Sequence, residues 1–127
     1  MSIIICARNE EDNLKQFLPI VLQQDYPTFE VIVVNDGSSD DTITVLDELQ
    51  KTFPILRYTT IDRNPSSIKY PISPKKMAIT LGVKAAKYEQ LLFIDADCRP
   101  SSTHWLALMV RNFLPETEFI LGYGGYF

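Results

Sequence analysis

Two aspartates follow a short apolar run in the second half of the chain. Leu91 to Ile94 are apolar, and Asp95 and Asp97 come next, separated only by Ala96. In extended backbone the side chains of residues i and i+2 point the same way, so both charges are expected on one side. Their repulsion is costly at the edge of an apolar layer unless a cation lies near them. Two carboxylates are oxygen-only ligands, which suit Mg²⁺ or Mn²⁺.

The same D-A-D motif also suits a purely structural role. Asp97 could cap a following helix or turn the chain, while Asp95 could accept backbone hydrogen bonds. The motif taken alone leaves both alternatives open. Polar clusters that follow two other predicted strands favour the binding hypothesis.

The first of these clusters follows the apolar run Ser2 to Cys6. It consists of Ala7, Arg8, Asn9 and Glu10. The second cluster, the segment NDGSSDD at residues 35–41, follows the predicted buried strand Phe29 to Val34. Asp36 comes at the end of that run, where its carboxylate can accept a hydrogen bond from a base N–H or a ribose hydroxyl. Gly37 allows a ligand or a backbone segment to come close.

The NDGSSDD segment also has good turn and helix-capping chemistry. We therefore expect Ser39, Asp40 and Asp41 to be mostly structural. Lys75 and Lys76 open a predicted helix after a long irregular stretch, and a lysine at a helix N-terminus can meet a diphosphate. The alternative for this pair is a solvated, exposed turn. His104, the only histidine, is expected to be a surface residue.

The elements that must position these residues alternate along the chain. Strands are predicted at 2–6, 29–34, 55–61, 90–94 and 118–123, and helices at 14–22, 40–49, 75–87 and 102–113. This βαβαβαβαβ order predicts an α/β fold, a mostly parallel sheet with helices on both faces. In such sheets ligands bind outside the carboxyl ends of the strands, so the three polar clusters are expected at one edge.

Composition narrows the class of protein. The chain has 127 residues, which suits one domain, and its apolar and charged shares of 46% and 22% are typical of a soluble globular protein. A net charge of −4 argues against nucleic-acid binding. Cys6 and Cys98 form no CxxC pair and are expected to be reduced and at least partly buried. No apolar run is long enough to span a membrane, and no signal peptide is visible.

Four segments in order resemble the inverting glycosyltransferases of family 2, which have the GT-A fold. They are SIIICARNEEDNL, VIVVNDGSSDDT, KKMAITLGVKAA and LLFIDADC. The resemblance implies a three-layer, Rossmann-like sheet, a nucleotide-diphosphate sugar as donor (a UDP- or GDP-sugar) and a divalent metal, Mg²⁺ or Mn²⁺. By position, it implies nucleotide contacts from Ala7, Arg8, Asn9, Glu10, Asp36, Lys76 and Asp95. It also implies that Asp97, with Asp95, holds the metal.

The sequence departs from the family pattern in the first loop, where Cys6, Ala7 and Arg8 replace the usual proline and aromatic residue. Members also have a general base well after the DxD motif, in the half that binds the acceptor. We therefore expect residues 1–127 to be a truncated, nucleotide-sugar-binding part of the domain, with the base beyond residue 127. Such a part would bind donor without turnover, and the apolar FILGYGGYF end favours self-association.

The resemblance further implies a cytoplasmic location, with the parent protein at the cytoplasmic face of a membrane, and a saccharide or lipid-linked glycan as acceptor. Two other functions fit the same architecture. A nucleotidyltransferase would usually carry a glycine-rich, basic phosphate loop after the first strand, and CARNEED is acidic without glycine. A noncatalytic nucleotide-binding module is the other alternative, and the intact DxD motif weighs against it.

Overall fold

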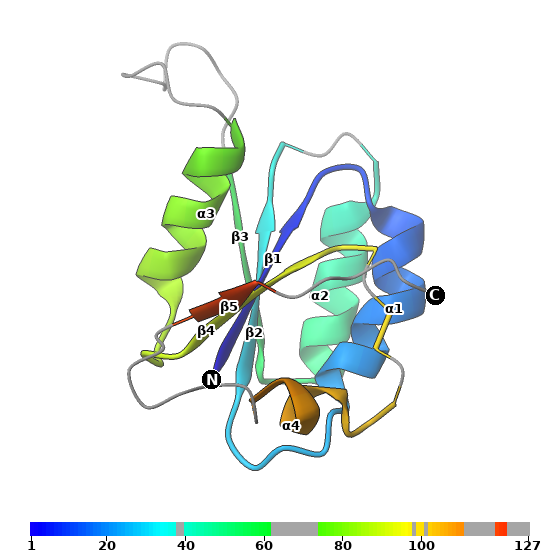
Figure 1. Cartoon of the computed structure of the whole chain (residues 1–127). Coiled ribbons are helices and arrows are strands. Elements are labelled where there is room, and N and C mark those ends of the chain that lie inside the picture. The colour runs from blue at the N-terminus through cyan, green and yellow to red at the C-terminus, as the bar shows by residue number, and fades with distance from the viewer. Residues whose placement is uncertain (38–39, 62–73, 98, 101, 111–118, 122–127) are drawn as a thin grey trace.

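In the computed structural model the chain is folded around one sheet with the strand order β3-β2-β1-β4-β5 (Figure 1). The structure describes residues 1–37, 40–61, 74–97, 99–100, 102–110 and 119–121. Its strands are β1 (Ser2–Ala7), β2 (Glu30–Asn35), β3 (Leu56–Thr60), β4 (Leu91–Asp95) and β5 (Phe119–Leu121). Each pair of neighbouring strands is parallel. The α/β class and the parallel sheet predicted from the alternation are thus confirmed.

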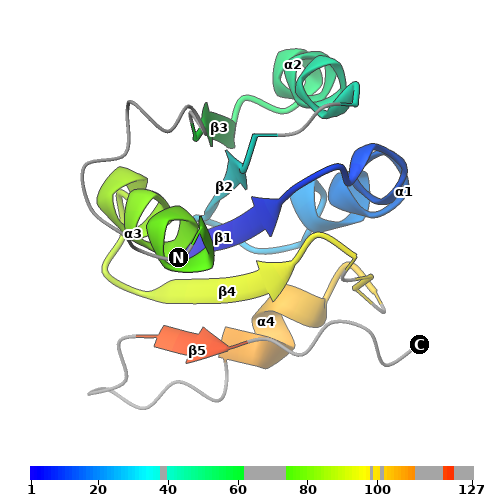
Figure 2. The same ribbon diagram turned by 90° about the horizontal axis from the view of Figure 1, so that it is seen from above.

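Helices cover both faces of the sheet. They are α1 (Glu11–Leu22), α2 (Thr42–Thr52), α3 (Pro74–Ala85) and α4 (Trp105–Val110). Viewed from above, α1 and α2 lie on one side of the strands and α3 lies on the other (Figure 2). Among the described residues, every helix is too short or too polar to cross a lipid bilayer.

The larger core lies between the sheet and helices α1 and α2. Strand β1 sends alternate side chains to the two faces, and Ile3, Ile5 and Ala7 pack in one cluster with Leu14 and Leu18 of α1. All five are nearly or fully buried, and burying a large aliphatic side chain contributes roughly 1.5–3 kcal/mol. This packing holds α1 against the central strand and so fixes the two ends of the loop between them.

The opposite face of the sheet packs against α3. Val34 and Ala78 form a small buried cluster there, with the half-buried Cys6 beside it, as the sequence predicted for this cysteine. Farther along α3, a Cβ atom added to Gly82 would overlap Cγ2 of Ile4, because the two would lie well inside van der Waals contact. Glycine is therefore what lets this helix approach β1 so closely.

Helix α1 is longer than its apolar stripe predicted. It begins at Glu11 rather than at Leu14, and it contains Pro19. Proline lacks an N–H and cannot bond the carbonyl of Lys15, one turn earlier. The apolar face of α1 is buried nonetheless, so packing offsets that loss. Among the residues singled out from the sequence, Ser39 and Cys98 lie outside the described residues, as do the C-terminal end of the helix predicted at 102–113 and both ends of the strand predicted at 118–123.

A buried acid ties three strands together at the amino edge of the sheet. Glu30 is only 5% exposed and accepts hydrogen bonds from Oγ of Ser2 (2.7 Å) and the N–H of Lys87 (2.6 Å). Its other oxygen accepts from Nε and Nη2 of Arg57 at 3.2 and 2.5 Å. Nη2 of Arg57 also donates to the carbonyl of Ala85 at the end of α3 (2.6 Å). Sequence reasoning missed this network.

Burial by itself raises the pKa of Glu30. The hydrogen bonds from the Lys87 N–H, Ser2 and Arg57 act in the opposite direction and leave the pKa below its ordinary value of 4.5. Glu30 is therefore ionised at neutral pH, and both of its carboxylate oxygens accept hydrogen bonds.

Candidate functional site

The three polar clusters lie at the carboxyl edge of the sheet. Strand β1 ends at Ala7, with β2 on one side and β4 on the other. Ala7 pairs with Asn35, and Cys6 pairs with Asp95. The chain runs outward from β1 through β2 and β3 and then returns to β4, so the strand order reverses at β1. Open α/β sheets bind ligands at this switch point.

Asp36 extends β2 by one residue at this edge. Its N–H donates to the carbonyl of Ala7 at 2.8 Å, and the residue is 9% exposed. Neighbouring strands lie about 4.8 Å apart, so the ends of β2 and β4, which flank β1, lie roughly 10 Å apart. One nucleotide can bridge that separation. By strand alternation, Asp36 and Asp95 both belong to the face that α3 covers.

Asp95 is the last residue of β4, and Asp97 lies in the turn that follows; both are exposed. Helix α4 begins only at Trp105, so Asp97 does not cap it. Within the described part of the chain, no three His, Cys, Asp or Glu side chains gather as a metal site. Two open carboxylates suit a divalent cation that keeps positions for other oxygen ligands, so the donor set fits Mg²⁺ or Mn²⁺.

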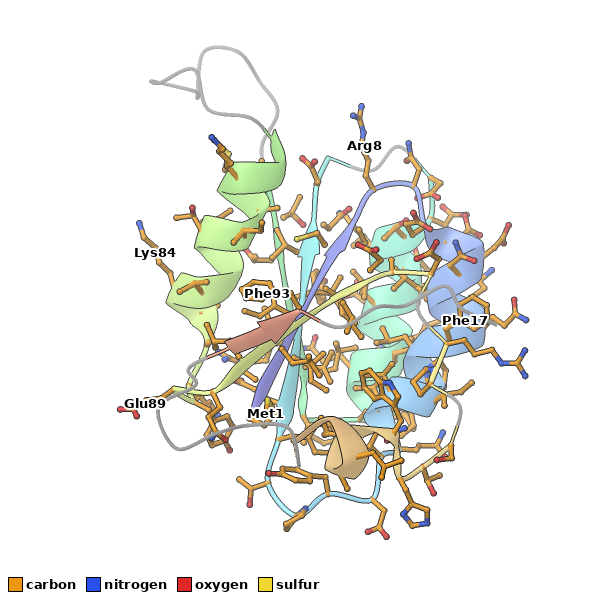
Figure 3. The ribbon with its side chains drawn as sticks, in the orientation of Figure 1. Met1, Arg8, Phe17, Lys84, Glu89 and Phe93 are labelled. Atoms are coloured by element: carbon orange, nitrogen blue, oxygen red, sulfur yellow. The ribbon has the colours of Figure 1, made fainter. Side chains whose placement is uncertain are left out.

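The β1–α1 loop presents Arg8 and Asn9 to solvent. Arg8 extends from the top of the molecule, at the opposite end from Met1 and Glu89 (Figure 3). Asn9 has a left-handed backbone with φ of 53°. The carboxylate of Glu10, the residue before α1, accepts from Nδ2 of Asn13 at 2.6 Å. Glu10 therefore already has a structural partner.

The first turn of α3 carries Lys76 to the same edge. Lys76 is exposed, and the next residue, Met77, packs beside Val34 near the end of β2. Oγ1 of Thr80 donates to the carbonyl of Lys76 at 2.8 Å. The side chain of Lys75 lies outside the described residues.

His104 lies away from this edge. It is exposed, and its Nδ1 is 3.8 Å from Oδ2 of Asp25, which follows the C-terminal end of α1. The prediction of a surface histidine is confirmed.

Gln24, next to Asp25, is buried and fixes the start of α4. Its Nε2 donates to the carbonyl of Ser102 and its Oε1 accepts from the N–H of Leu106, each at 2.9 Å.

A pair of carboxylates joins the first two loops of this edge. Asp40 accepts from the N–H of Glu11 at 3.3 Å and from the N–H of Thr42 at 3.0 Å, and also from the Thr42 hydroxyl. Glu11 in turn accepts from the N–H of Asp41 at 3.1 Å. The structural role predicted for Asp40 is confirmed, but local capping signals do not indicate its contact with α1.

The comparisons with known proteins concern most of the chain. Residues 2–122 match the family model described as "Glycosyl transferase family 2". Over 97 residues, 76% of this chain, the sequence is 31% identical to the poly-beta-1,6-N-acetyl-D-glucosamine synthase of Staphylococcus epidermidis. The aligned part makes up 21% of that synthase.

Two solved structures share the fold. TarS 1-349 of Staphylococcus aureus, in complex with UDP-GlcNAc, aligns with a TM-score of 0.67 and 27% identity. The mannosyltransferase PcManGT of Pyrobaculum calidifontis, in complex with GDP-Man and Mn²⁺, aligns with a TM-score of 0.68 and 25% identity. Each alignment covers 87% of this chain, but only 30% and 31% of the two solved chains. The chain thus spans a third or less of the lengths of these relatives.

Proposed function

Because the chain belongs to glycosyl transferase family 2, we propose that the carboxyl edge of its sheet binds a nucleotide-diphosphate sugar for inverting transfer to an acceptor hydroxyl. The single observation that carries this proposal is the position of Asp36 and Asp95 on the two strands that flank the end of β1. The relatives in complex with UDP-GlcNAc and with GDP-Man support the choice of ligand class.

Each residue of the edge has a role in the proposal. Asp36, at the end of β2, accepts a hydrogen bond from the base or the ribose. The segment from Ala7 to Glu10 lines the nucleotide, and Arg8 and Lys76 bring positive charge to the diphosphate. Asp95, which pairs with Cys6 of β1, lies on the ribose side.

A divalent cation belongs to the proposal as well. Asp97 and Asp95 would hold it, because they are exposed carboxylates two residues apart on one strand end. When bound, the cation neutralises charge on the diphosphate leaving group. The PcManGT complex, which contains Mn²⁺ and GDP-Man, supports this assignment.

The proposal gives no residue of this chain the role of general base. Deprotonating the acceptor hydroxyl needs such a base, and we expect it beyond residue 127. For that reason we propose that residues 1–127 act as the donor-binding part and do not turn over alone. A saccharide or lipid-linked acceptor, self-association, and a parent protein at the cytoplasmic face of a membrane all stay predictions.

Calorimetry tests the proposed site with UDP and GDP, each titrated with and without Mn²⁺. The wild type is expected to bind at least one of the two nucleotides more tightly when Mn²⁺ is present. The Asp97→Asn variant is expected to raise the dissociation constant in Mn²⁺ by roughly tenfold or more, because it removes a charged ligand worth more than about 1.4 kcal/mol. Asp25→Asn is the matched control, since Asp25 is exposed and lies beyond the far end of α1.

The Mn²⁺ dependence and the comparison of the two variants test whether the DxD motif forms the site. If Mn²⁺ makes no difference, or if Asp97→Asn binds like Asp25→Asn, the DxD site is wrong. If sulfate and phosphate bind as tightly as the nucleotides, the edge is a general anion site at a helix N-terminus and the proposal of nucleotide recognition fails.

A further inference from the structure

We propose that Asp40, together with Glu11, is a positioning residue that holds the two nucleoside-facing loops in register. The role rests on the proposed function, because it concerns how the same edge recognises its ligand. Neither carboxylate is expected to touch the nucleotide. Both act through the backbone of the loops that carry Arg8 and Asp36.

The link between the two loops is reciprocal. The carboxylate of Asp40, which precedes α2, accepts the N–H of Glu11 in the first turn of α1 at 3.3 Å. The carboxylate of Glu11 accepts the N–H of Asp41 at 3.1 Å and the ammonium of Lys15 at 3.1 Å. Each helix therefore supplies an acceptor for a backbone donor at the start of the other. The first N–H groups of a helix have no partner within the helix, so these bonds satisfy them.

The two oxygens of Asp40 have different partners. Oδ1 bonds to the start of α2, where it accepts from the N–H of Thr42 at 3.0 Å and from the Thr42 hydroxyl. Oδ2 crosses to α1 and accepts from Glu11. Capping and cross-linking are thus separable, and a side chain with only one acceptor oxygen can do the first without the second.

The loops that this link joins have matching geometry. Ala7 pairs with Asn35, so Asn9 and Gly37 stand at equivalent positions two residues beyond the paired strand ends. Both have left-handed backbones, with φ of 53° and 61°. Past these two positions, the carboxylates of Asp40 and Glu11 link the starts of α1 and α2. The link therefore limits how far the backbones of Arg8 and Asp36 can move apart.

A preorganised pair of loops binds more tightly because less conformational freedom is lost when the ligand arrives. Ligands that reach both loops should show this effect, and ligands that reach Arg8 and the DxD motif but not Asp36 should not. UDP and GDP are probes of the first kind. Inorganic pyrophosphate with Mn²⁺ is a probe of the second kind, since it has no nucleoside.

The test is the Asp40→Asn variant. Asparagine keeps one oxygen for Thr42, but its amide nitrogen replaces the oxygen that faces the N–H of Glu11. We expect the dissociation constant for UDP or GDP in Mn²⁺ to rise roughly five- to tenfold, the range for losing one typical hydrogen bond, because the bond from Asp40 to Glu11 is exposed to solvent. Affinity for pyrophosphate with Mn²⁺ is expected to change by less than about twofold.

Two controls separate positioning from plain destabilisation. Asp41→Asn changes the neighbouring carboxylate, whose side chain makes no capping hydrogen bond, and is expected to bind nucleotide like the wild type. Glu30→Gln weakens the fold at the opposite edge and is expected to lower the melting temperature without changing nucleotide affinity. If Asp40→Asn fails to fold, Glu11→Ala breaks the link from the other helix, and the same split between nucleotide and pyrophosphate is expected.

The outcomes distinguish the positioning role from the function on which it rests. If the wild type binds neither UDP nor GDP in Mn²⁺, the proposed function fails and the positioning role falls with it. If the wild type binds nucleotide and Asp40→Asn binds it as tightly, only the positioning role is wrong. An equal loss of nucleotide and pyrophosphate affinity would also overturn the positioning role, because it would indicate a general disturbance of the edge.

Discussion

Replacing Glu30 by glutamine is expected to destabilise the fold by about 2–3 kcal/mol, and the geometry of its partners explains why. One oxygen of Glu30 accepts from both Ser2 and the N–H of Lys87, and the other accepts two bonds from Arg57. Glutamine has one acceptor oxygen and one donor group. Whichever way its amide is turned, its NH₂ faces a donor, either the Lys87 N–H or the Arg57 guanidinium.

The magnitude follows from burial. A buried donor left without an acceptor costs about 1–3 kcal/mol. The lost charge adds less, because the Arg57 side chain is 40% exposed and ion pairs near solvent contribute only about 0–1 kcal/mol. The expected loss is a large share of the free energy of unfolding of an average domain, which is roughly 5–15 kcal/mol.

Urea denaturation at pH 7, followed by the fluorescence of Trp105, measures the change, because Trp105 is the single tryptophan and packs against the larger core. Glu89→Gln is the matched control: Glu89 is exposed and lies near Met1, at the other end of the molecule from Arg8 (Figure 3). Its effect is expected to stay within about 0.5 kcal/mol.

The pH dependence provides a second check. Because the folded state lowers the pKa of Glu30 below 4.5, its contribution is complete above pH 4.5 and is lost as the pH falls through the folded-state pKa. Glutamine does not titrate. The stability gap between wild type and Glu30→Gln should therefore be widest at neutral pH and should narrow below pH 4.5. A gap below about 0.5 kcal/mol at pH 7, or one that widens in acid, would refute this account of the network.

Two further substitutions test how helices are fixed to the sheet. Gly82→Ala is expected to destabilise the protein by about 1–2 kcal/mol, because the new Cβ would overlap Cγ2 of Ile4. Alanine favours helices more than glycine does, but this gain in helix propensity is smaller than the cost of overpacking. A higher melting temperature of the variant would contradict this. Gln24→Leu is expected to cost about 1–3 kcal/mol by removing the acceptor of the Leu106 N–H and the donor to the Ser102 carbonyl. Unchanged hydrogen exchange at the Leu106 amide would show that the contact does not hold α4.

Local patterns in the sequence were enough to predict the order of the elements and the edge at which the polar clusters meet. Apolar runs of strand length alternate with amphipathic stripes, and each signal is local, so it can be found without knowing the fold. Parallel strands joined by helices must bring their carboxyl ends to one edge, so the alternation alone predicts Asp36 and Asp95 at that edge. Their binding roles stay predictions.

Which groups become neighbours across the molecule depends on how the elements pack. The strand order places β1 between β2 and β4, which puts Asp36 and Asp95 on either side of Ala7. It also joins Glu30 to Arg57 and Lys87, which are 27 and 57 residues away in the chain, and Asp40 to Glu11, 29 residues away. No local sequence pattern predicts these bonds. The partners of such a carboxylate are far away in the sequence and become its neighbours only when the helices and strands pack together.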